Sequence, residues 1–472
     1  MILRVKKLTR WADLLQNVPI KSKVRHSAIV ITLLYTVLTP AVAGTQRKTS
    51  AEKLERVAAL INGNQLVEAE QQLNQILRIA PNDARALNFF GTIRAKQGRL
   101  KEAEGFFLRA IRLEDNLVGA HMNLAYLYLL RGEPDKTALQ LEKVLSLDPA
   151  NADAAYRLAW VLFSQGRFDE CIAVVDKVRQ SQTLSAPILA VLGDAYLRKG
   201  DTTKAEESYL LALDAQTNTD ALIGLAQLWQ TKGDTKMAVA YVDRASSLTN
   251  SPEQLYKLAR VSLNLHLKDQ AVVALKQAVV LRPDEPSYHF ALGTAWLNQP
   301  PDLQAAEQSF QQFLKLKPDD PQGQVHLGYV LLKQKKQAEA RTWLLKSIGN
   351  GVGTPEAFYY LGLISQAENQ DAEAIQLFQK SVQLAPSFAS AHVALGSSYL
   401  KLKDYERAQQ ALEAGVKLSP DDSKAHYNLA MLYARLKNPE KAQEEMRIVE
   451  RLKSQGKEPQ DDSGSLAPPR PR

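Results

Sequence analysis

The sequence predicts an all-α fold, a solenoid built from about twelve helical hairpins. The main observation is a residue pair, Leu or Phe followed by Gly or Ala, which occurs eleven times at spacings of 33 to 35 residues from Phe90-Gly91 to Leu429-Ala430. An alanine recurs in step with this pair, and prolines close several of the repeats. A fixed period in this range is typical of architectures in which each repeat packs only against its neighbours.

The hairpin around Gly200 shows the pattern of one repeat. Apolar residues recur at three- and four-residue spacing on both sides of Gly200, which predicts two amphipathic helices. Gly200 supplies the positive φ that ends the first helix, and Thr202 and Thr203 are the expected cap of the second. We expect the helices to cross at Gly193, with the Tyr209 side chain filling the space beside it.

The order Leu-Gly-x-x-Tyr, then Gly, then Ala-x-x-x-Phe/Tyr, then Pro resembles the tetratricopeptide repeat (TPR) family. The resemblance covers residues 50–455 as about twelve repeats. It implies a right-handed superhelix whose first helices line a concave face, and it implies the binding of other proteins.

The N-terminal segment resembles an export signal. Residues 1–43 hold seven basic residues and one acidic residue, a net charge of +6, and residues 28–39 form a short apolar run followed by the small residues of an A-x-A site. We expect cleavage before Gly44 and a periplasmic or secreted protein of the exported bacterial type. The alternative is an uncleaved anchor in the inner membrane, with residues 28–43 as the tether.

Charge and composition limit the other functions. The whole chain carries a net charge of +8, so only +2 remains outside residues 1–43, too little to favour nucleic-acid binding. Residues 456–472 are rich in Pro, Gly and charged residues, which predicts a disordered tail. Cys171 is the one cysteine and takes the place of the recurring alanine, which predicts a buried structural residue.

The residue patterns predict neither catalysis, nor a cofactor, nor a metal. Four of the seven histidines hold one repeat position, three residues before the Leu-Gly/Ala pair, so that the repeat explains them: His121, His289, His392 and His426. No nucleophile elbow, phosphate-binding loop or zinc motif is present, and nearly every residue from 50 to 455 belongs to the stack.

The concave face supplies the candidate binding site. Repeats three and four place the densest set of inward apolar side chains there, namely Met122, Tyr126, Tyr156, Trp160 and Phe163, next to Leu129. Later repeats add Tyr256, Phe290, Tyr329, Tyr359 and Tyr427. Such a row suits an extended peptide or an amphipathic helix. The alternative is that these rings cover one another between adjacent first helices.

Some proteins of the TPR family bind a C-terminal carboxylate through a clamp of Lys and Asn/Arg side chains on successive first helices. Asn123 and Arg157 match the clamp pattern, but Asn88 and Asp153 stand where lysines are expected, so the set is incomplete. The function we predict is a non-enzymatic protein-binding scaffold of the cell envelope. The alternative is an accessory scaffold for polysaccharide export or biofilm secretion, because aromatic rows also stack on sugar rings.

Overall fold

The computed structural model describes residues 45–180, 183–349 and 353–455, and the described chain is helical with short connections. It divides into two compact blocks, the N-terminal block Met1–Asp234 and the C-terminal block Thr235–Arg472. The described helices of the N-terminal block are α2 (Thr45–Asn62), α3 (Leu66–Ile79), α4 (Ala84–Lys96), α5 (Leu100–Leu113), α6 (Val118–Leu130), α7 (Pro134–Leu147), α8 (Ala152–Ser164), α9 (Phe168–Arg179), α10 (Ala186–Lys199), α11 (Thr202–Ala215) and α12 (Thr219–Thr231). Those of the C-terminal block are α13 (Thr235–Ser246), α14 (Pro252–Asn264), α15 (Lys268–Leu281), α16 (Pro286–Trp296), α17 (Leu303–Leu316), α18 (Pro321–Lys333), α19 (Gln337–Gly349), α20 (Pro355–Ala367), α21 (Asp371–Leu384), α22 (Ala389–Lys401), α23 (Tyr405–Leu418), α24 (Ser423–Arg435) and α25 (Pro439–Ser454).

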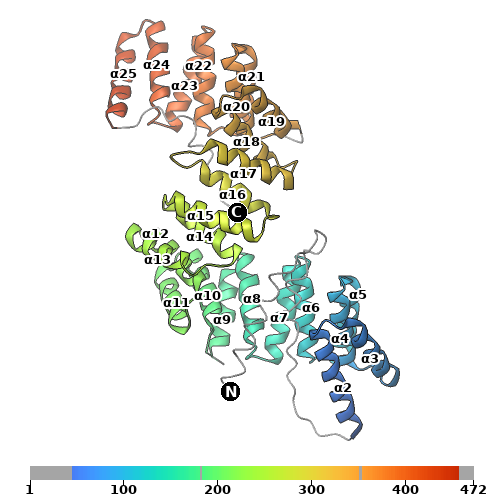
Figure 1. Cartoon of the computed structure of the whole chain (residues 1–472). Coiled ribbons are helices and arrows are strands. Elements are labelled where there is room, and N and C mark those ends of the chain that lie inside the picture. Colours follow the sequence, from blue (N-terminus) through green and yellow to red (C-terminus); the bar gives the residue numbers. More distant parts are fainter. Residues whose placement is uncertain (1–44, 181–182, 350–352, 456–472) are drawn as a thin grey trace. The chain divides into compact units, whose positions relative to one another are not determined.

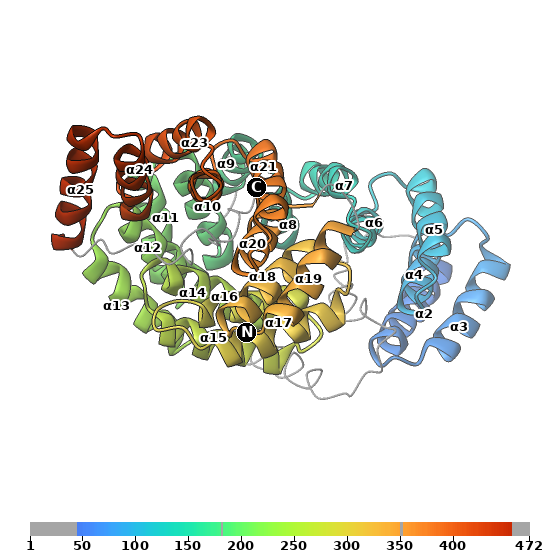
Figure 2. The same cartoon turned by 90° about the horizontal axis from the view of Figure 1, so that it is seen from above.

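These helices form the predicted all-α solenoid. Within each block, consecutive helices pair as hairpins, and each hairpin packs against the next one along the chain (Figures 1 and 2). The even-numbered helices begin the hairpins and carry the Leu-Gly/Ala pairs from α4 onward. The fold class inferred from the 34-residue period is therefore confirmed.

The crossing between α10 and α11 is as tight as the sequence predicts. The Tyr209 side chain is fully buried, and a Cβ built on Gly193 would lie 2.5 Å from its ring. A Cβ on Gly224 of the next repeat would lie 2.4 Å from the same ring. Tyr209 thus fills the space between two glycines on α10 and α12, and its hydroxyl donates to Asp194 at 2.6 Å. One side chain fixes the spacing of three helices.

The turn between α10 and α11 corrects one prediction. Gly200 has φ of 83°, as expected for a residue that ends a helix in the left-handed region. The cap of α11 is Asp201, whose carboxylate accepts from the Lys204 amide at 3.1 Å, and α11 begins at Thr202. The prediction of a threonine cap was wrong because a carboxylate already stands at the N-cap position.

The left-handed turn after a first helix has glycine in most repeats of the N-terminal block and other residues in the C-terminal block. In the N-terminal block the left-handed residue after the first helix is Asn64 in the first repeat and glycine in the five that follow: Gly98, Gly132, Gly166, Gly200 and Gly233. In the C-terminal block non-glycine residues hold positive φ: His266, Lys335, Asn369, Lys403 and Lys437. The backbone geometry is conserved between turns although an L-residue is strained there.

Ion pairs link successive repeats at one recurring place. A basic residue within three residues of the end of a first helix pairs with an acidic residue early in the second helix of the preceding repeat. The pairs are Arg94–Glu70, Arg131–Glu104, Lys199–Asp169, Lys232–Glu206, Lys336–Glu307 and Lys401–Asp371. Each is partly exposed and contributes little alone, so that the recurrence chiefly fixes the register between neighbours.

Several predictions lie outside the described residues. These are the export signal or anchor in residues 1–43 and the disordered tail in residues 456–472. Among the helices of the described ranges, none is both long and apolar enough to span a membrane.

Candidate functional site

The candidate site lies on α6 and α8, the first helices of repeats three and four. Trp160 is the most exposed of the five predicted residues, with 45% of its surface accessible. Met122, Tyr156 and Phe163 are half-buried, and the Phe163 ring lies 5.5 Å from that of Phe168. The fifth, Tyr126, is 3% exposed. The structure therefore gives the predicted cluster one open ring and three partly open side chains.

Tyr126 does not belong to the open surface, and its predicted role as an exposed groove residue is wrong. Its hydroxyl donates to the Asp153 carboxylate of the next repeat. The Arg157 guanidinium lies 4.3 Å from the centre of the Tyr126 ring and donates from Nε to Asp153 at 2.9 Å. Burial, followed by the hydrogen bond to Asp153, raises the pKa of Tyr126. Tyr126 is a covered ring that joins α6 to α8.

Tyr126 and Trp160 differ in exposure although they hold the same repeat position, two residues after the Leu of the Leu-Gly/Ala pair. We call this the groove position. The residue 31 places later, one before the Leu of the next pair, is the cover position: Arg157 for Tyr126 and Val191 for Trp160. Arg157 is long enough to lie over the Tyr126 ring, whereas Val191 ends at two methyl groups. The short cover residue leaves the Trp160 ring open.

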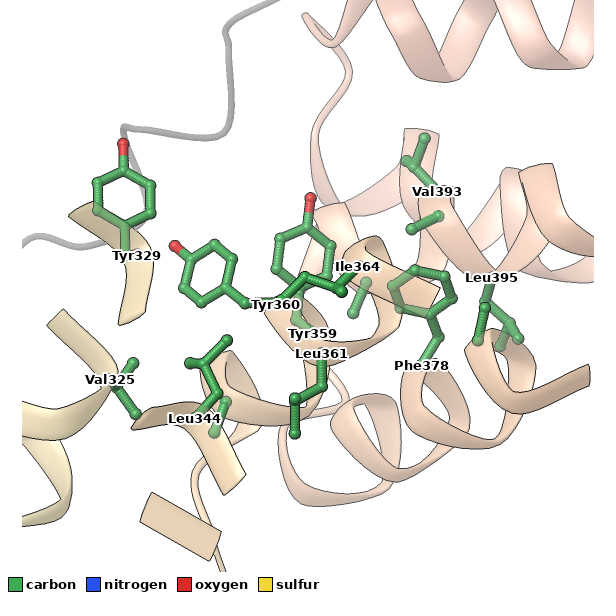
Figure 3. Packing of buried hydrophobic residues seen from close by; sticks show 14 of the residues in the cluster. Val325, Tyr329, Leu344, Tyr359, Tyr360, Leu361, Ile364, Phe378, Val393 and Leu395 are labelled. Carbon is green, nitrogen blue, oxygen red and sulfur yellow. The ribbon is translucent and has the colours of Figure 1, made fainter. Parts of the chain in front are cut away.

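The C-terminal block contains a second covered ring. Tyr329 holds the groove position of its repeat, and its cover residue is Tyr360; the two ring centres are 5.3 Å apart and the residues are 3% and 1% exposed. Tyr359 is 1% exposed, and its ring contacts that of Phe378 (Figure 3). It also contacts the ring of Phe388. The prediction that Tyr329 and Tyr359 point into a groove was wrong, and mutual coverage is the correct interpretation for both.

The other aromatics of the later repeats range from rings that pack on neighbouring rings to one that is open. Phe290 is half-buried and contacts the rings of Phe310, Phe313 and His326 at 4.8 to 5.6 Å. Tyr256 is half-buried beside Tyr288. Tyr427 is 48% exposed on α24, the last first helix of the described chain.

The four recurring histidines have a shared structural role. Each Nε2 lies 2.8 to 2.9 Å from a backbone carbonyl six residues earlier: His121 with Asp115, His289 with Pro283, His392 with Pro386 and His426 with Pro420. A carbonyl only accepts, so Nε2 donates in every case. The histidine at this position therefore links the connection between two repeats to the start of the first helix that follows it.

The residues of the incomplete carboxylate clamp form two separate pairs. Asn88 and Asn123 are 5% and 6% exposed, and the Asn123 amide donates to Asn88 at 2.9 Å and to Thr92 at 3.2 Å. Arg157 is paired with Asp153. The two asparagines link α4 to α6, whereas the Arg157–Asp153 pair lies within α8.

Cys171 packs where the sequence places it, on α9 behind α8. Its side chain is fully buried, and burial raises the pKa of the thiol to about 12. At neutral pH the thiol is protonated, which is the unreactive form.

Comparison with protein families agrees with the fold. A tetratricopeptide repeat model matches residues 256–321, 302–353 and 393–456, and another tetratricopeptide repeat model matches residues 356–387. The chain carries tetratricopeptide repeats. A third model, the N-terminal ARM repeat of tetratricopeptide repeat protein 21, matches residues 64–272. The predicted TPR resemblance is thereby confirmed, whereas the exported bacterial type stays a prediction.

Two curated relatives and one solved structure resemble the chain over part of its length. The human protein O-mannosyl-transferase TMTC3 is 25% identical over 281 residues, covering 57% of this chain and 30% of the relative. Cellulose synthase operon protein C of Pseudomonas fluorescens is 29% identical over 228 residues, covering 44% of this chain and 18% of the relative. A tetratricopeptide repeat protein from Parabacteroides merdae has 19% identity and a TM-score of 0.44 over 52% of this chain and 99% of its own. The chain spans less than a third of the length of either curated relative.

Proposed function

We propose that the chain is a non-enzymatic scaffold that binds another protein through the surface formed by Tyr156, Trp160 and Phe163 on α8. The observation that carries the proposal is the 45% exposure of Trp160 within a repeat whose other large side chains are mostly covered. Tryptophan is among the residues that dominate binding energy at interfaces. The TPR fold supports the general role, since it presents such side chains on rigid helices.

A double substitution tests this proposal. Trp160→Ala with Tyr156→Ala removes two rings from the α8 surface, and we expect it to abolish capture of the partner by the full-length protein. The matched control is Leu139→Ala, because Leu139 is 62% exposed on the neighbouring second helix α7. The control should bind normally. Unchanged capture by a double variant with a normal thermal midpoint would rule out the α8 surface.

The second candidate function is support of polysaccharide export. It rests on the similarity to cellulose synthase operon protein C, together with the ability of an exposed indole to stack on a sugar ring. Protease treatment of the partner fraction separates the two functions. Binding that survives protease and is lost after glycan digestion would favour the polysaccharide, and the reverse would favour a protein.

The cellular site we propose is the envelope, with export by residues 1–43. The basic region, the apolar run and the A-x-A site support it. Sequencing of the N-terminus of the envelope-bound protein should give Gly44. A protein that begins at Met1 and stays with the inner membrane would instead have an uncleaved anchor, and a protein found only in the cytoplasm would contradict export.

A further inference from the structure

The tryptophans of the described chain differ in what lies over their rings. Lys232 lies 4.6 Å from the ring centre of Trp229, Lys276 lies 5.0 Å from that of Trp296, and Lys346 lies 4.2 Å from that of Trp343. Within the described ranges, Trp160 has no cation over its ring. Trp160 is also the most exposed of these four indoles. A tryptophan ring is the best aromatic partner for a cation, so the uncovered ring of Trp160 is able to bind one.

We call the contact between two successive repeats a junction. The junction between repeats three and four shows which chemical group fits over an aromatic ring at the groove position. There Arg157 extends from the cover position, and its guanidinium lies over the Tyr126 ring. The next junction has the same helical geometry, with Trp160 in place of Tyr126 and Val191 in place of Arg157. The junction between repeats four and five thus keeps the aromatic ring, but valine replaces the arginine that would place a cation over it. Val191 is 8% exposed, and its short side chain carries no charge.

The neighbouring repeat supplies one acidic side chain, Asp194. Asp194 holds the groove position of the next repeat on α10, which packs against α8. Its carboxylate already accepts from the Tyr209 hydroxyl and so has a fixed orientation. A carboxylate one repeat away from an aromatic face complements a ligand that carries a positive charge on an extended chain.

We propose that the open face of Trp160 is the docking position for an arginine side chain of a protein partner, which takes the place that Arg157 takes over Tyr126. This inference rests on the proposed protein-binding function of the same surface. It gives the partner a chemistry: an extended segment in which arginine alternates with apolar residues. The guanidinium lies on the indole, and the apolar residues contact Tyr156 and Phe163.

The inference is tested on the full-length protein with two labelled peptides in a fluorescence anisotropy titration. One peptide repeats Arg-Pro-Leu, and the other replaces every arginine by citrulline, which keeps the shape and removes the charge. We expect the arginine peptide to bind roughly five-fold more tightly, the ratio for one cation–π contact at a partly exposed site. Asp194→Asn should weaken binding of the arginine peptide and leave the citrulline peptide unchanged.

Val191→Arg supplies the missing cation from within the chain. It should occupy the Trp160 face as Arg157 occupies Tyr126, and so reduce the affinity of the arginine peptide at least as much as citrulline does. Leu139→Arg adds the same charge on the outer helix α7 and should have no such effect. Trp160→Leu provides the same test at an exposed side chain in case the change at the buried Val191 disturbs folding.

The outcomes separate this inference from the proposed function. Equal binding of both peptides, or an arginine peptide that binds Trp160→Leu as tightly as the unmodified protein, would overturn the arginine site. If neither peptide binds while the double variant at Trp160 and Tyr156 still loses its partner, the arginine site is overturned and the protein-binding surface stands. If the double variant keeps its partner, the proposed surface itself fails.

Discussion

The junction between repeats three and four and the junction between repeats four and five have the same backbone plan and opposite surfaces. In the first, Tyr126 lies under Arg157 and is 3% exposed; in the second, Trp160 has Val191 at its cover position and is 45% exposed. The larger ring is thus the more exposed one. The difference shows that exposure on this face depends on the side chain one repeat further along, rather than on the aromatic residue itself.

The largest effect on stability should come from removing the covered ring. Tyr126→Ala deletes a buried aromatic side chain and leaves Asp153 without its hydroxyl donor, so we expect a loss of about 3 kcal/mol or more in the free energy of unfolding. Trp160→Ala should cost about 1 kcal/mol, because half of its ring is already in water. Urea unfolding of both variants measures the two values. Equal losses would mean that the two junctions do not differ as the exposures indicate.

A somewhat smaller loss is expected from overpacking the crossing that positions Val191. Gly193→Leu would drive a side chain into the Tyr209 ring, since even a Cβ would lie 2.5 Å from it, and we expect a cost of about 2–3 kcal/mol. Hydrogen exchange should show the loss in α10, α11 and α12 first, because stability in such arrays is nearly local. Equal loss over all repeats of the described chain would contradict a linear stack. Gly105→Leu is the control, because nothing lies within 4 Å of a Cβ built there.

The left-handed turns should give an effect of about 1 kcal/mol. A Cβ at Gly200 meets no neighbour within 4 Å, so that Gly200→Ala is strained only by its φ of 83°. We expect it to lower stability by about 1 kcal/mol. The reverse change, Lys403→Gly at φ of 63°, should raise stability by about 0.5 kcal/mol, since relief of strain exceeds the entropy cost of glycine. Thermal or urea unfolding measures both; a stabilising Gly200→Ala would contradict the assigned backbone.

The effect that is smallest near neutral pH comes from Cys171 behind the open junction, because its contribution to stability changes only at alkaline pH. Its pKa is raised to about 12 in the folded chain from an ordinary 9.0, so the folded state holds the proton more tightly. The stability that this provides is complete below pH 9.0 and is lost as the pH rises from there toward about 12. Cys171→Ala should remove that part of the alkaline loss. A thiol reagent at pH 8 should label unfolded protein only; rapid labelling of the native chain would show that repeat four opens.

Much of the fold follows from the sequence because its determinants are local and repeated. The Leu-Gly/Ala period gives the hairpins, and Gly193 with Tyr209 gives the crossing, since a ring and a glycine in step leave one packing solution. The cap of α11 was misassigned because Asp201 and Thr202 are both good caps and one residue of register decides between them.

The candidate site is harder to predict from the sequence, because a side chain in the next repeat decides whether a ring is covered. A search for aromatic residues at one position finds Tyr126, Trp160 and Tyr329 alike, and only one of them is open. The signal that separates them is present in the sequence at 31 residues further on, where arginine, valine and tyrosine differ in reach. Reading groove and cover positions together would have identified Trp160 and excluded the other two.

The central claim is that the Trp160 ring is open and Tyr126 is closed, and hydroxyl-radical footprinting of the full-length protein tests it directly. In the free protein, Trp160 should be modified far faster than Tyr126, and a bound partner should protect Trp160 without changing Trp229. Val191→Arg should protect Trp160 with no partner present. A Trp160 that is as slow to react as Tyr126 in the free protein, or that a bound partner leaves unprotected, would contradict the account.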